Sequence, residues 1–349
     1  MTFEEARAQY PVLERLAYLN TGTNGPLSRA AADAMVEATR RGLADGRGDR
    51  SYIETWLSLR DEVRERLARL ISVPPENVAL LNSTTAGCNI VIAGLDLTPE
   101  DEVVTTDSEH FGLIGPLHAS GARVVVSPPD EDEILARVTA RTRLLAVSHV
   151  LWTNGRRLDL RRLKAETGLP LLVDGAQSAG AVPVEATEAD FYTVSAQKWP
   201  CGPESTGALY VADPEALRVA APTYMAQERH EPDGSFVPCA GAARFDSAQI
   251  SPTALAGLCA ALDVHPEWRF ERAAEAARRC RELLSERFEV EPGEATLVAF
   301  RPEGEPAETV ARLRERDVVV RDIPGRGIVR VSCGYWTSDG DLERLLDAL

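Results

Sequence analysis

The sequence contains no apolar run near the ~20 residues that a membrane-spanning helix needs. Its first residues, MTFEEARAQYPVLERL, carry acids where a signal peptide has a basic and then an apolar segment. Its six cysteines form no CxxC pair, and its five histidines form no HExxH motif. We therefore expect a cytoplasmic protein with free or buried thiols, without a membrane segment, a disulfide framework or a metal site.

Basic residues are also scarce relative to acidic ones, 38 against 54, which gives a formal net charge of −16. This charge disfavours nucleic acid and anionic membranes as partners. It also means that an anionic ligand needs a local positive site against the overall field. The length of 349 residues permits a large domain and a smaller one.

One stretch, from Leu169 to Gly207, combines two apolar runs that each end in a reactive side chain. The first run reads as a buried strand and ends at Asp174, and the second is followed by Lys198. Open α/β sheets bind their ligands at the carboxyl ends of strands, so the two side chains are expected to lie close together. Taken singly, each is an ordinary loop acid or surface lysine. Together they supply what pyridoxal phosphate requires, an acid for its pyridine nitrogen and a lysine for a Schiff base.

The surrounding pattern alternates strands and helices and predicts an α/β fold with a mainly parallel sheet. The expected strands are 78–81, 102–105, 123–127, 142–150, 171–174, 191–194 and 207–211, with helices at 86–95, 131–140 and 159–167. We expect residues 220–244 to be irregular and a small α/β unit to follow, with strands at 296–300, 318–321 and 327–332. At 82–85 the turn NSTT opens a helix, whose N-terminus is a natural phosphate site.

Four segments, YLNTGTNGP, VDGAQSAG, SAQKWPCGPESTGALYV and RVSCGYW, resemble those of the class V aminotransferase family. That family comprises pyridoxal-phosphate enzymes of fold type I, including cysteine desulfurases and isopenicillin N epimerase-like proteins. The resemblance spans nearly the whole chain. It implies a large domain with a mostly parallel sheet of the seven-stranded type, a small C-terminal α/β domain, and a homodimer with active sites at the subunit interface. The implied division is an N-terminal segment (1–20) packed on the small domain, a cofactor-binding domain (21–250) and the small domain (251–349).

The resemblance also assigns roles to individual residues. Lys198 forms the Schiff base, Asp174 pairs with the pyridine nitrogen, Gln177 bonds the ring's phenolic oxygen and His110 stacks on the ring. The cofactor phosphate is assigned to Thr84, Thr85, Ser195 and Gln197, with Gln249 contributing to the partner subunit's site. Arg330 is assigned to the substrate carboxylate, with Asn20 and Trp152 on the same side. Alternatives remain for two of these residues, because His110 and Arg330 could be purely structural.

The chain departs from the cysteine desulfurase pattern in its C-terminal part. Desulfurases have a persulfide-forming cysteine shortly before the carboxylate arginine, and the stretch RERDVVVRDIPGRGIVR has none. Cys333 follows Arg330 on the expected strand, which favours a place in the core. Trp152 replaces an asparagine, and Ala248-Gln249 replaces a Gly-Thr pair.

These features predict an enzyme acting at the α-carbon of an amino acid, with Lys198 as general base. Transamination and β-elimination of the C–S lyase type are the favoured outcomes, ahead of epimerisation and desulfurase-like chemistry. These outcomes share the same residues around the cofactor, so the motifs do not separate them. A protein that keeps the fold without turnover is the alternative from another class.

Overall fold

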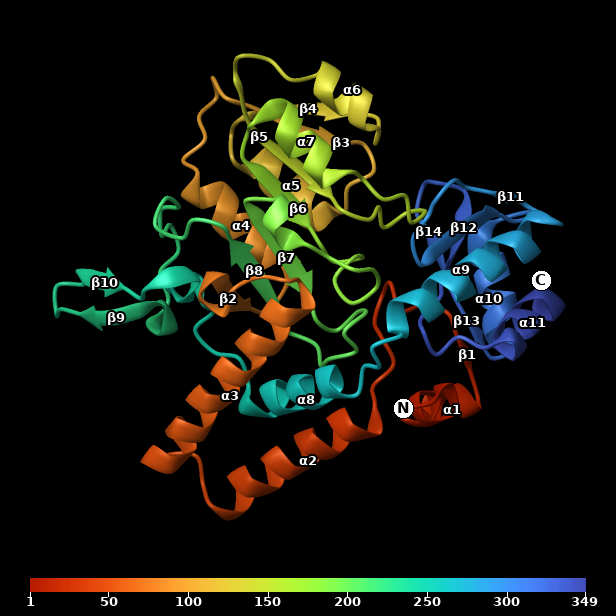
Figure 1. Cartoon of the computed structure of the whole chain (residues 1–349), viewed down its shortest axis with the longest axis horizontal. Coiled ribbons are helices and arrows are strands. Elements are labelled where there is room, and N and C mark those ends of the chain that lie inside the picture. The colour runs from red at the N-terminus through yellow and green to blue at the C-terminus, as the bar shows by residue number, and fades with distance from the viewer.

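The computed structural model describes the whole chain, residues 1–349, and a seven-stranded sheet forms its centre (Figure 1). The strands lie in the order β2-β8-β7-β6-β5-β3-β4. Their bounds are β2 Val78–Leu81, β3 Glu102–Thr106, β4 Arg123–Ser127, β5 Thr142–Ser148, β6 Leu171–Asp174, β7 Phe191–Ser195 and β8 Gly207–Val211. Only β8 runs antiparallel to its neighbours, β7 and β2. The predicted α/β fold with a mostly parallel seven-stranded sheet is confirmed.

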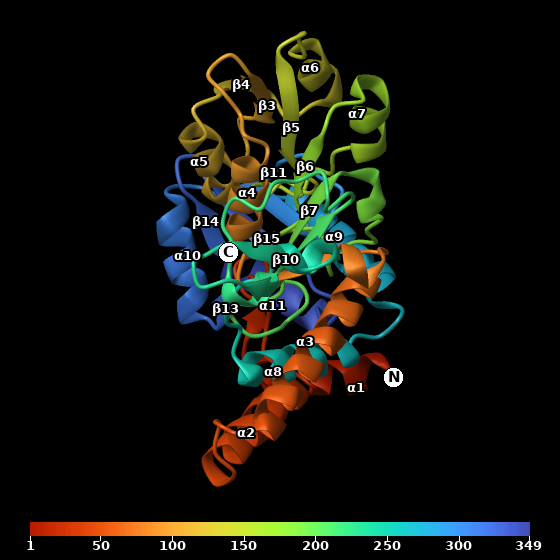
Figure 2. The same ribbon diagram turned by 90° about the vertical axis from the view of Figure 1, so that its left-hand side faces the viewer.

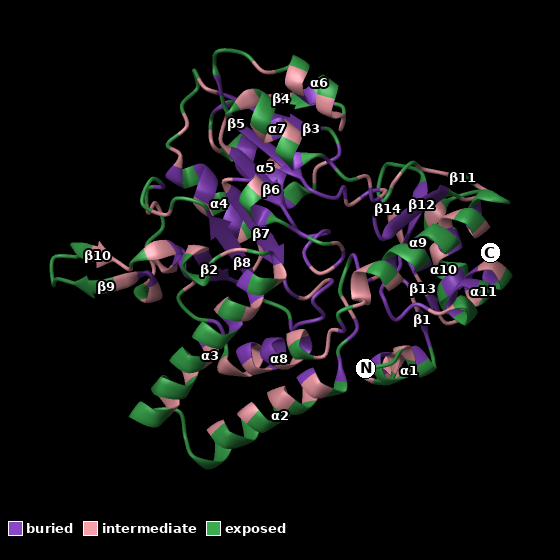
Figure 3. Cartoon of the chain, viewed as in Figure 1, coloured by how far each residue is buried: buried purple, intermediate pink, exposed green.

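Helices cover both faces of this sheet, which explains why its strands are nearly continuous apolar runs. On one face, Leu144 of β5 packs in a core with α4 (Thr84–Gly94) and α5 (Phe111–Ala119). On the other face, the next residue, Leu145, packs in a core shared by four helices. These are α3 (Arg50–Leu70), α6 (Glu131–Ala136), α7 (Leu160–Thr167) and α8 (Pro252–Asp263). Strands β2, β3, β6, β7 and β8 are accordingly buried throughout, whereas the edge strand β4 is partly exposed (Figure 3).

The C-terminal part of the chain forms a second, antiparallel sheet in the order β11-β12-β15-β14. Its strands are β11 Glu289–Val290, β12 Leu297–Arg301, β14 Arg321–Ile323 and β15 Ile328–Ser332. The accompanying helices are α9 Arg269–Ser285, α10 Pro306–Glu315 and α11 Asp339–Ala348. This unit has its own apolar core, in which Phe300, Val329 and Leu345 are buried.

The N-terminal elements lie beside this second sheet (Figure 1). Strand β1 (Ala17–Tyr18), which follows α1 (Phe3–Ala8), pairs in parallel with β13 (Val318–Val319). Helix α2 (Arg29–Ala44) then packs with α8, and α2 and α3 extend away from the sheet, as Figure 2 also shows. The division of the chain at 20/21 and 250/251 stays a prediction.

Three expectations about local structure were wrong. Residues 220–244 contain a hairpin of β9 (Gln227–His230) and β10 (Phe236–Pro238), whose tip has Gly234 at a φ of 88°. The Asp-Gly dipeptide at this tip was an available turn signal. The helix expected over 131–140 ends at Ala136, because Thr139 instead donates its hydroxyl to Glu102. The strand expected over 318–321 is divided between β13 and β14, which pair with β1 and β15.

No helix of the structure combines the length and the apolar character that crossing a lipid bilayer demands. Short 3₁₀ helices complete the fold: η1 Pro11–Glu14, η2 Pro75–Asn77, η3 Ala186–Glu188, η4 Tyr224–Ala226 and η5 Gly241–Phe245.

Candidate active site

A cavity of about 240 Å³, here called the strand-end cavity, lies where β6 and β7 end and α4 begins. It brings together all but two of the predicted site residues: Thr84, Thr85, His110, Trp152, Asp174, Gln177, Ser195, Gln197, Lys198 and Arg330. Five further residues line it and were not assigned to the site from the sequence: Gly22, Thr23, Ser83, Ala176 and Arg321. Segments from both sheets therefore meet at this cavity.

A larger cavity, of about 510 Å³, is lined by charged residues such as Glu131, Arg157 and Glu294. It contains neither lysine nor a predicted site residue. Size alone does not identify a functional site. Polar groups that converge on a lysine whose pKa is shifted, as that of Lys198 is, are a better indication. We therefore regard the smaller strand-end cavity as the candidate active site.

Asp174 and Lys198 reach the strand-end cavity from adjacent parallel strands. Asp174 is the last residue of β6, is almost fully buried, and its Oδ1 accepts a hydrogen bond from the Ala176 N–H at 2.9 Å. Lys198 follows the end of β7, and burial lowers its pKa to about 8 although Asp174 opposes the shift. About a tenth of this amine is therefore uncharged at pH 7, and the uncharged form is the one that a nucleophile or base requires. The only other lysine of the chain, Lys164, pairs with Asp190 at 2.6 Å.

The helix end of the cavity offers donors to an anion. Ser83 caps α4, its hydroxyl accepting from the Ala86 N–H at 3.1 Å, and Thr84 and Thr85 form the first turn. The positive end of an 11-residue helix therefore faces the cavity. Ser195 donates its hydroxyl to the Gln197 side-chain oxygen at 2.9 Å, which leaves the Gln197 amide N–H groups available. This end provides the local positive site that an anionic ligand needs in an acidic protein.

Gln177 is held in place by two protein contacts. Its Nε2 donates to the Gly22 carbonyl at 2.8 Å, and its Oε1 accepts from the Trp199 indole at 3.0 Å. One amide hydrogen remains for a ligand. Gly22 is required here because a Cβ would lie 2.7 Å from Nη2 of Arg330 and 3.0 Å from Oε1 of Gln177. In the sequence, the glycine-rich run NTGTNGP indicates a turn, but it does not indicate that Gly22 lies against Arg330 and Gln177.

His110 and Trp152 form one wall, with ring centroids 5.4 Å apart and planes at 89°. Nδ1 of His110 accepts from the Gly112 N–H at 3.1 Å, so the neutral ring carries its hydrogen on Nε2. Partial burial and the nearby Lys198 charge lower the pKa of His110, which keeps the ring neutral at pH 7. His110 therefore lies beside the cavity as a flat, uncharged ring.

Two arginines supply the cationic end of the cavity. Arg330 on β15 is fully buried, and its Nη1 donates to the Trp152 carbonyl at 2.6 Å. Its Nε and Nη2, which form one edge of the guanidinium, have no partner. Burial and the nearby Arg321 lower the pKa of Arg330 to about 9. A buried cation with an open edge is suited to a bidentate carboxylate, as predicted for this residue.

Arg321 on β14 is the second arginine, and sequence reasoning missed it. Its Nε donates to the Asp322 carbonyl at 3.1 Å, Nη1 lies 3.4 Å from the Thr23 hydroxyl, and the guanidinium stands 5.8 Å from the Trp152 ring centroid. None of these partners is a carboxylate. It was missed because residues 318–321 were expected to form one strand. In the structure Arg321 belongs to a separate strand, β14, which pairs with β15 and so places Arg321 opposite Arg330.

Two predicted site residues do not line the strand-end cavity. Asn20 accepts the Thr23 hydroxyl at 2.9 Å and so supports a residue that does line it, while a contact of Asn20 with the substrate stays a prediction. Gln249 is exposed and does not reach the cavity of its own chain. A role for Gln249 at a partner subunit's phosphate stays a prediction.

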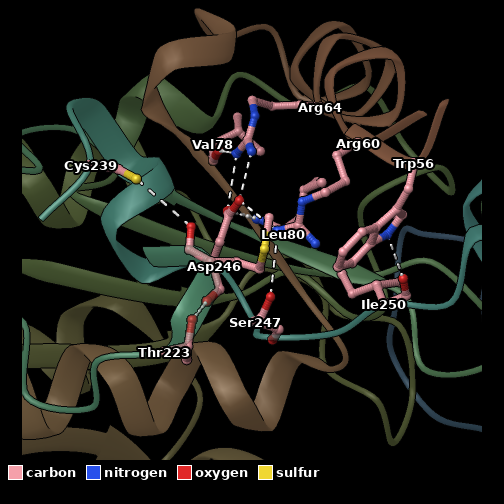
Figure 4. Close-up of polar contacts among 11 residues, drawn as sticks. Trp56, Arg60, Arg64, Val78, Leu80, Thr223, Cys239, Asp246, Ser247 and Ile250 are labelled. Carbon is pink, nitrogen blue, oxygen red and sulfur yellow. Dashed lines mark hydrogen bonds and ion pairs between the residues drawn. The ribbon is translucent and has the colours of Figure 1, made fainter. Parts of the chain in front are cut away.

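The segment that carries Gln249 is anchored by a buried ion cluster (Figure 4). Asp246 accepts from Arg60 at 2.8 Å, from Arg64 at 2.7 Å and from the Leu80 N–H at 2.7 Å. Arg60 and Asp246 are both buried, so removing Asp246 would leave the Arg60 charge uncompensated. The cluster fixes the start of this segment against α3 and β2.

None of the six cysteines lines the strand-end cavity, and all are free thiols. Cys333 is fully buried in the core of the C-terminal sheet, where sequence reasoning expected it. The site as folded thus lacks a thiol beside Arg330.

The groups that line the strand-end cavity match the parts of pyridoxal phosphate. A buried carboxylate, an amine of lowered pKa, a helix N-terminus with hydroxyls and a flat ring are all present. The open edge of Arg330 remains for a carboxylate outside the cofactor.

Comparisons with known proteins agree with this interpretation. Isopenicillin N epimerase of Streptomyces clavuligerus is 30% identical, with 99% of this chain and 97% of that protein covered. A cysteine desulfurase of Cronobacter sakazakii is 32% identical over 63% of this chain and 60% of that protein. The structure of a C-DES mutant with glycine covalently linked to its pyridoxal-phosphate cofactor superposes with a TM-score of 0.90, at 27% identity and 98% coverage of both chains.

A second C-DES structure, described as a cystine C–S lyase in complex with its product cysteine persulfide, gives a TM-score of 0.89 at 27% identity. It covers 97% of this chain and 98% of that chain. The aminotransferase class-V family itself matches residues 18–313. The chain therefore belongs to the aminotransferase class-V family, as its sequence motifs predicted.

Proposed function

We propose that this protein is a pyridoxal-phosphate-dependent C–S lyase that eliminates the β-substituent of a sulfur-containing amino acid with a second carboxylate. The observation that carries the proposal is that Arg321 and Arg330 both line the strand-end cavity, whereas no cysteine lines it. The cofactor, pyridoxal phosphate, supplies an electron sink for the α-carbon. Asp174, Gln177, Lys198 and the N-terminus of α4 are the residues that would hold it.

Lys198 is the group suited to move the α-proton. Its pKa of about 8 leaves a fraction of the amine neutral near physiological pH, and it is the one lysine at the cavity. A base of this pKa removes a proton efficiently at the operating pH. His110 does not compete for this role, because its Nδ1 accepts from the Gly112 N–H and its Nε2 carries a hydrogen.

Arg330 is suited to bind the α-carboxylate and so to orient the substrate. Its open Nε and Nη2 edge matches the two oxygens of a carboxylate. Arg321 would then bind a second anionic group, because its guanidinium lies at the same cavity and has no carboxylate partner. The relative described as a cystine C–S lyase makes cystine, which has two carboxylates, the first substrate to test.

The cavity lining supports elimination over sulfur transfer to a protein thiol. A desulfurase mechanism needs a cysteine that reaches the substrate sulfur, whereas the thiols here lie outside the cavity. In an elimination, cystine and water give pyruvate, ammonia and cysteine persulfide, so the leaving sulfur departs on the product. That balance requires no protein thiol and no external oxidant.

The test is a product analysis of the cofactor-loaded protein with cystine, cysteine and a panel of L-amino acids. We expect pyruvate from cystine, with little from cysteine. Arg321→Gln should lower kcat/KM for cystine about tenfold, the effect of one partly exposed charge contact, and leave monocarboxylic amino acids unaffected. Equal loss for both classes would contradict the role of Arg321.

The runner-up is an epimerase, favoured by the 30% identity to isopenicillin N epimerase over almost the whole chain. Inversion at the α-carbon without keto acid would establish it and exclude the lyase. Transfer of the amino group to a keto acid would indicate an aminotransferase. Cofactor binding without turnover of any amino acid would leave a binding protein.

We also propose a homodimer, in which the exposed Gln249 reaches the partner's phosphate site from its anchored segment. Gln249→Ala should then weaken cofactor binding in the dimer. An unchanged cofactor affinity would remove Gln249 from the site.

A further inference from the structure

Glu109 lies between the ends of two neighbouring parallel strands, β3 and β5, immediately before His110. Its Oε1 accepts from the Thr106 hydroxyl at 2.7 Å and from the Ser148 N–H at 3.1 Å. Its Oε2 accepts from the Ser148 hydroxyl at 2.5 Å. The carboxyl is therefore held by three donors, and none of them is a cation.

Ser148 connects this carboxyl to the candidate active site. It lines a recess that shares His110, Asp174 and Lys198 with the strand-end cavity. In the parallel register of β5 and β6, Ser148 pairs with Asp174. Paired residues of adjacent strands project to the same face of a sheet, so the two side chains are neighbours.

The titratable groups around Glu109 are Asp174 on β6, the buried thiol of Cys88 on α4 and Lys198 across the recess, while the adjacent His110 is a neutral ring. None of them forms an ion pair with Glu109. Burial raises the pKa of Glu109 to about 7, against the hydrogen bonds from Ser148 and Thr106, and Asp174 raises it further. The carboxyl therefore changes its protonation state in the neutral pH range.

We propose that Glu109 is a positioning residue whose proton sets the direction of its hydrogen bond with Ser148, and thereby whether Ser148 donates to Asp174. When Glu109 is ionised, the Ser148 hydroxyl donates to Oε2 and turns only lone pairs toward Asp174. When Oε2 carries the proton, it donates to the Ser148 oxygen, and the serine hydrogen turns to Asp174. The proton stays on Glu109, and only hydrogen-bond directions change.

The consequence concerns the carboxylate assigned to the cofactor's pyridine nitrogen. A hydrogen bond from Ser148 fixes the orientation of the Asp174 carboxyl, whereas an ionised Glu109 withdraws that hydrogen bond. The protonated state of Glu109 thus favours a fixed Asp174 carboxyl and tighter cofactor binding. This inference rests on the proposed cofactor site but not on the proposed substrate class.

The first test is carbon NMR of the cofactor-free protein labelled at glutamate carboxyls. The Glu109 signal, assigned by its loss in Glu109→Gln, should titrate with a midpoint near pH 7. Ser148→Ala removes a donor to the ionised form and should raise that midpoint by about one pH unit. Ser127→Ala, at the end of β4 with its hydroxyl on the Pro128 carbonyl, is the matched control and should leave it unchanged. A midpoint below pH 5.5, or no change in Ser148→Ala, would overturn the proposal.

The second test measures the pyridoxal-phosphate dissociation constant from pH 6 to 8.5. Glu109→Gln keeps the protonated pattern at every pH, because its amide donates to Ser148 while its carbonyl accepts from Thr106. Lys198 titrates in both proteins and therefore changes the cofactor affinity of both alike. As the pH rises, the cofactor affinity of the unaltered protein should fall several-fold relative to that of Glu109→Gln. Identical curves would contradict the proposal. If neither the unaltered protein nor Glu109→Gln bound the cofactor, the proposed function would fail. The NMR titration would still decide the role of Glu109.

Discussion

The two ends of the strand-end cavity differ in how their polar groups are satisfied. At the cofactor end, Ser83, Gln177 and Ser195 already bond to other protein groups. At the substrate end, Arg330 has two unpartnered nitrogens, and Arg321 has no carboxylate partner. One end is arranged in advance by the protein, and the other is completed by a ligand.

This difference separates the expected effects of substitutions. Changes at the cofactor end should alter cofactor binding and turnover, because groups there are oriented before any ligand arrives. Changes at the substrate end should act mainly on KM, because the missing interaction is made with the amino acid. The predictions below test this separation.

Lys198→Ala should have the largest effect. Loss of the base and of the covalent attachment should lower turnover at least ~1,000-fold. Lys164→Arg is the matched control, since it keeps the contact with Asp190 outside the cavity. Turnover of Lys198→Ala within tenfold of the unaltered protein would refute the assignment.

Arg330→Met should raise KM for the amino acid roughly 100-fold with a smaller change in kcat, because a buried bidentate contact is lost. The lowered pKa of Arg330 means that its charged form opposes folding throughout the pH range below about 9. Thermal unfolding of the variant should therefore show no decrease in Tm. A large decrease in Tm would mean that Arg330 is primarily structural.

Gly22→Ala should raise KM about tenfold, since its methyl group would displace the buried Arg330 guanidinium and thus weaken carboxylate binding. Gly48→Ala is the control, because a Cβ there meets no atom within 4 Å. Steady-state kinetics with one amino acid distinguish the two. Equal KM values in both variants would show that Arg330 tolerates the displacement.

The last prediction concerns pH and changes no residue. Only the neutral amine of Lys198 can attach to the cofactor, and its pKa is about 8. The rate of covalent attachment should therefore rise about tenfold per pH unit below that value and level off above it. A rate that rises steadily to pH 10 would indicate an ordinary, unperturbed lysine.

The cofactor end could be predicted from the sequence because its signals are local. Asp174 and Lys198 follow apolar runs that end as strands, and Thr84 begins a helix. Parallel topology then places these ends together without further information. His110 and Gln177 came from the resemblance and also line the cavity, whereas their proposed contacts with the cofactor remain predictions.

The substrate end could be predicted only in part because it depends on contacts between distant segments. Gly22 matters through its distance to Arg330, and Arg321 through a strand that pairs differently from the expected one. Asn20 was assigned to the substrate because its segment resembled the family's, and its hydrogen bond with the Thr23 hydroxyl could not be read from the sequence. Periodicity and composition carry no information about such packing.

The most direct test of the central claim uses the fact that the chain has two lysines. The protein is incubated with pyridoxal phosphate, reduced with borohydride and digested, and the modified peptide is identified by mass spectrometry. We predict the pyridoxyl group on Lys198 in stoichiometric yield and none on Lys164. Modification of Lys164 alone, or of neither lysine, would contradict the assignment of the strand-end cavity as the cofactor site.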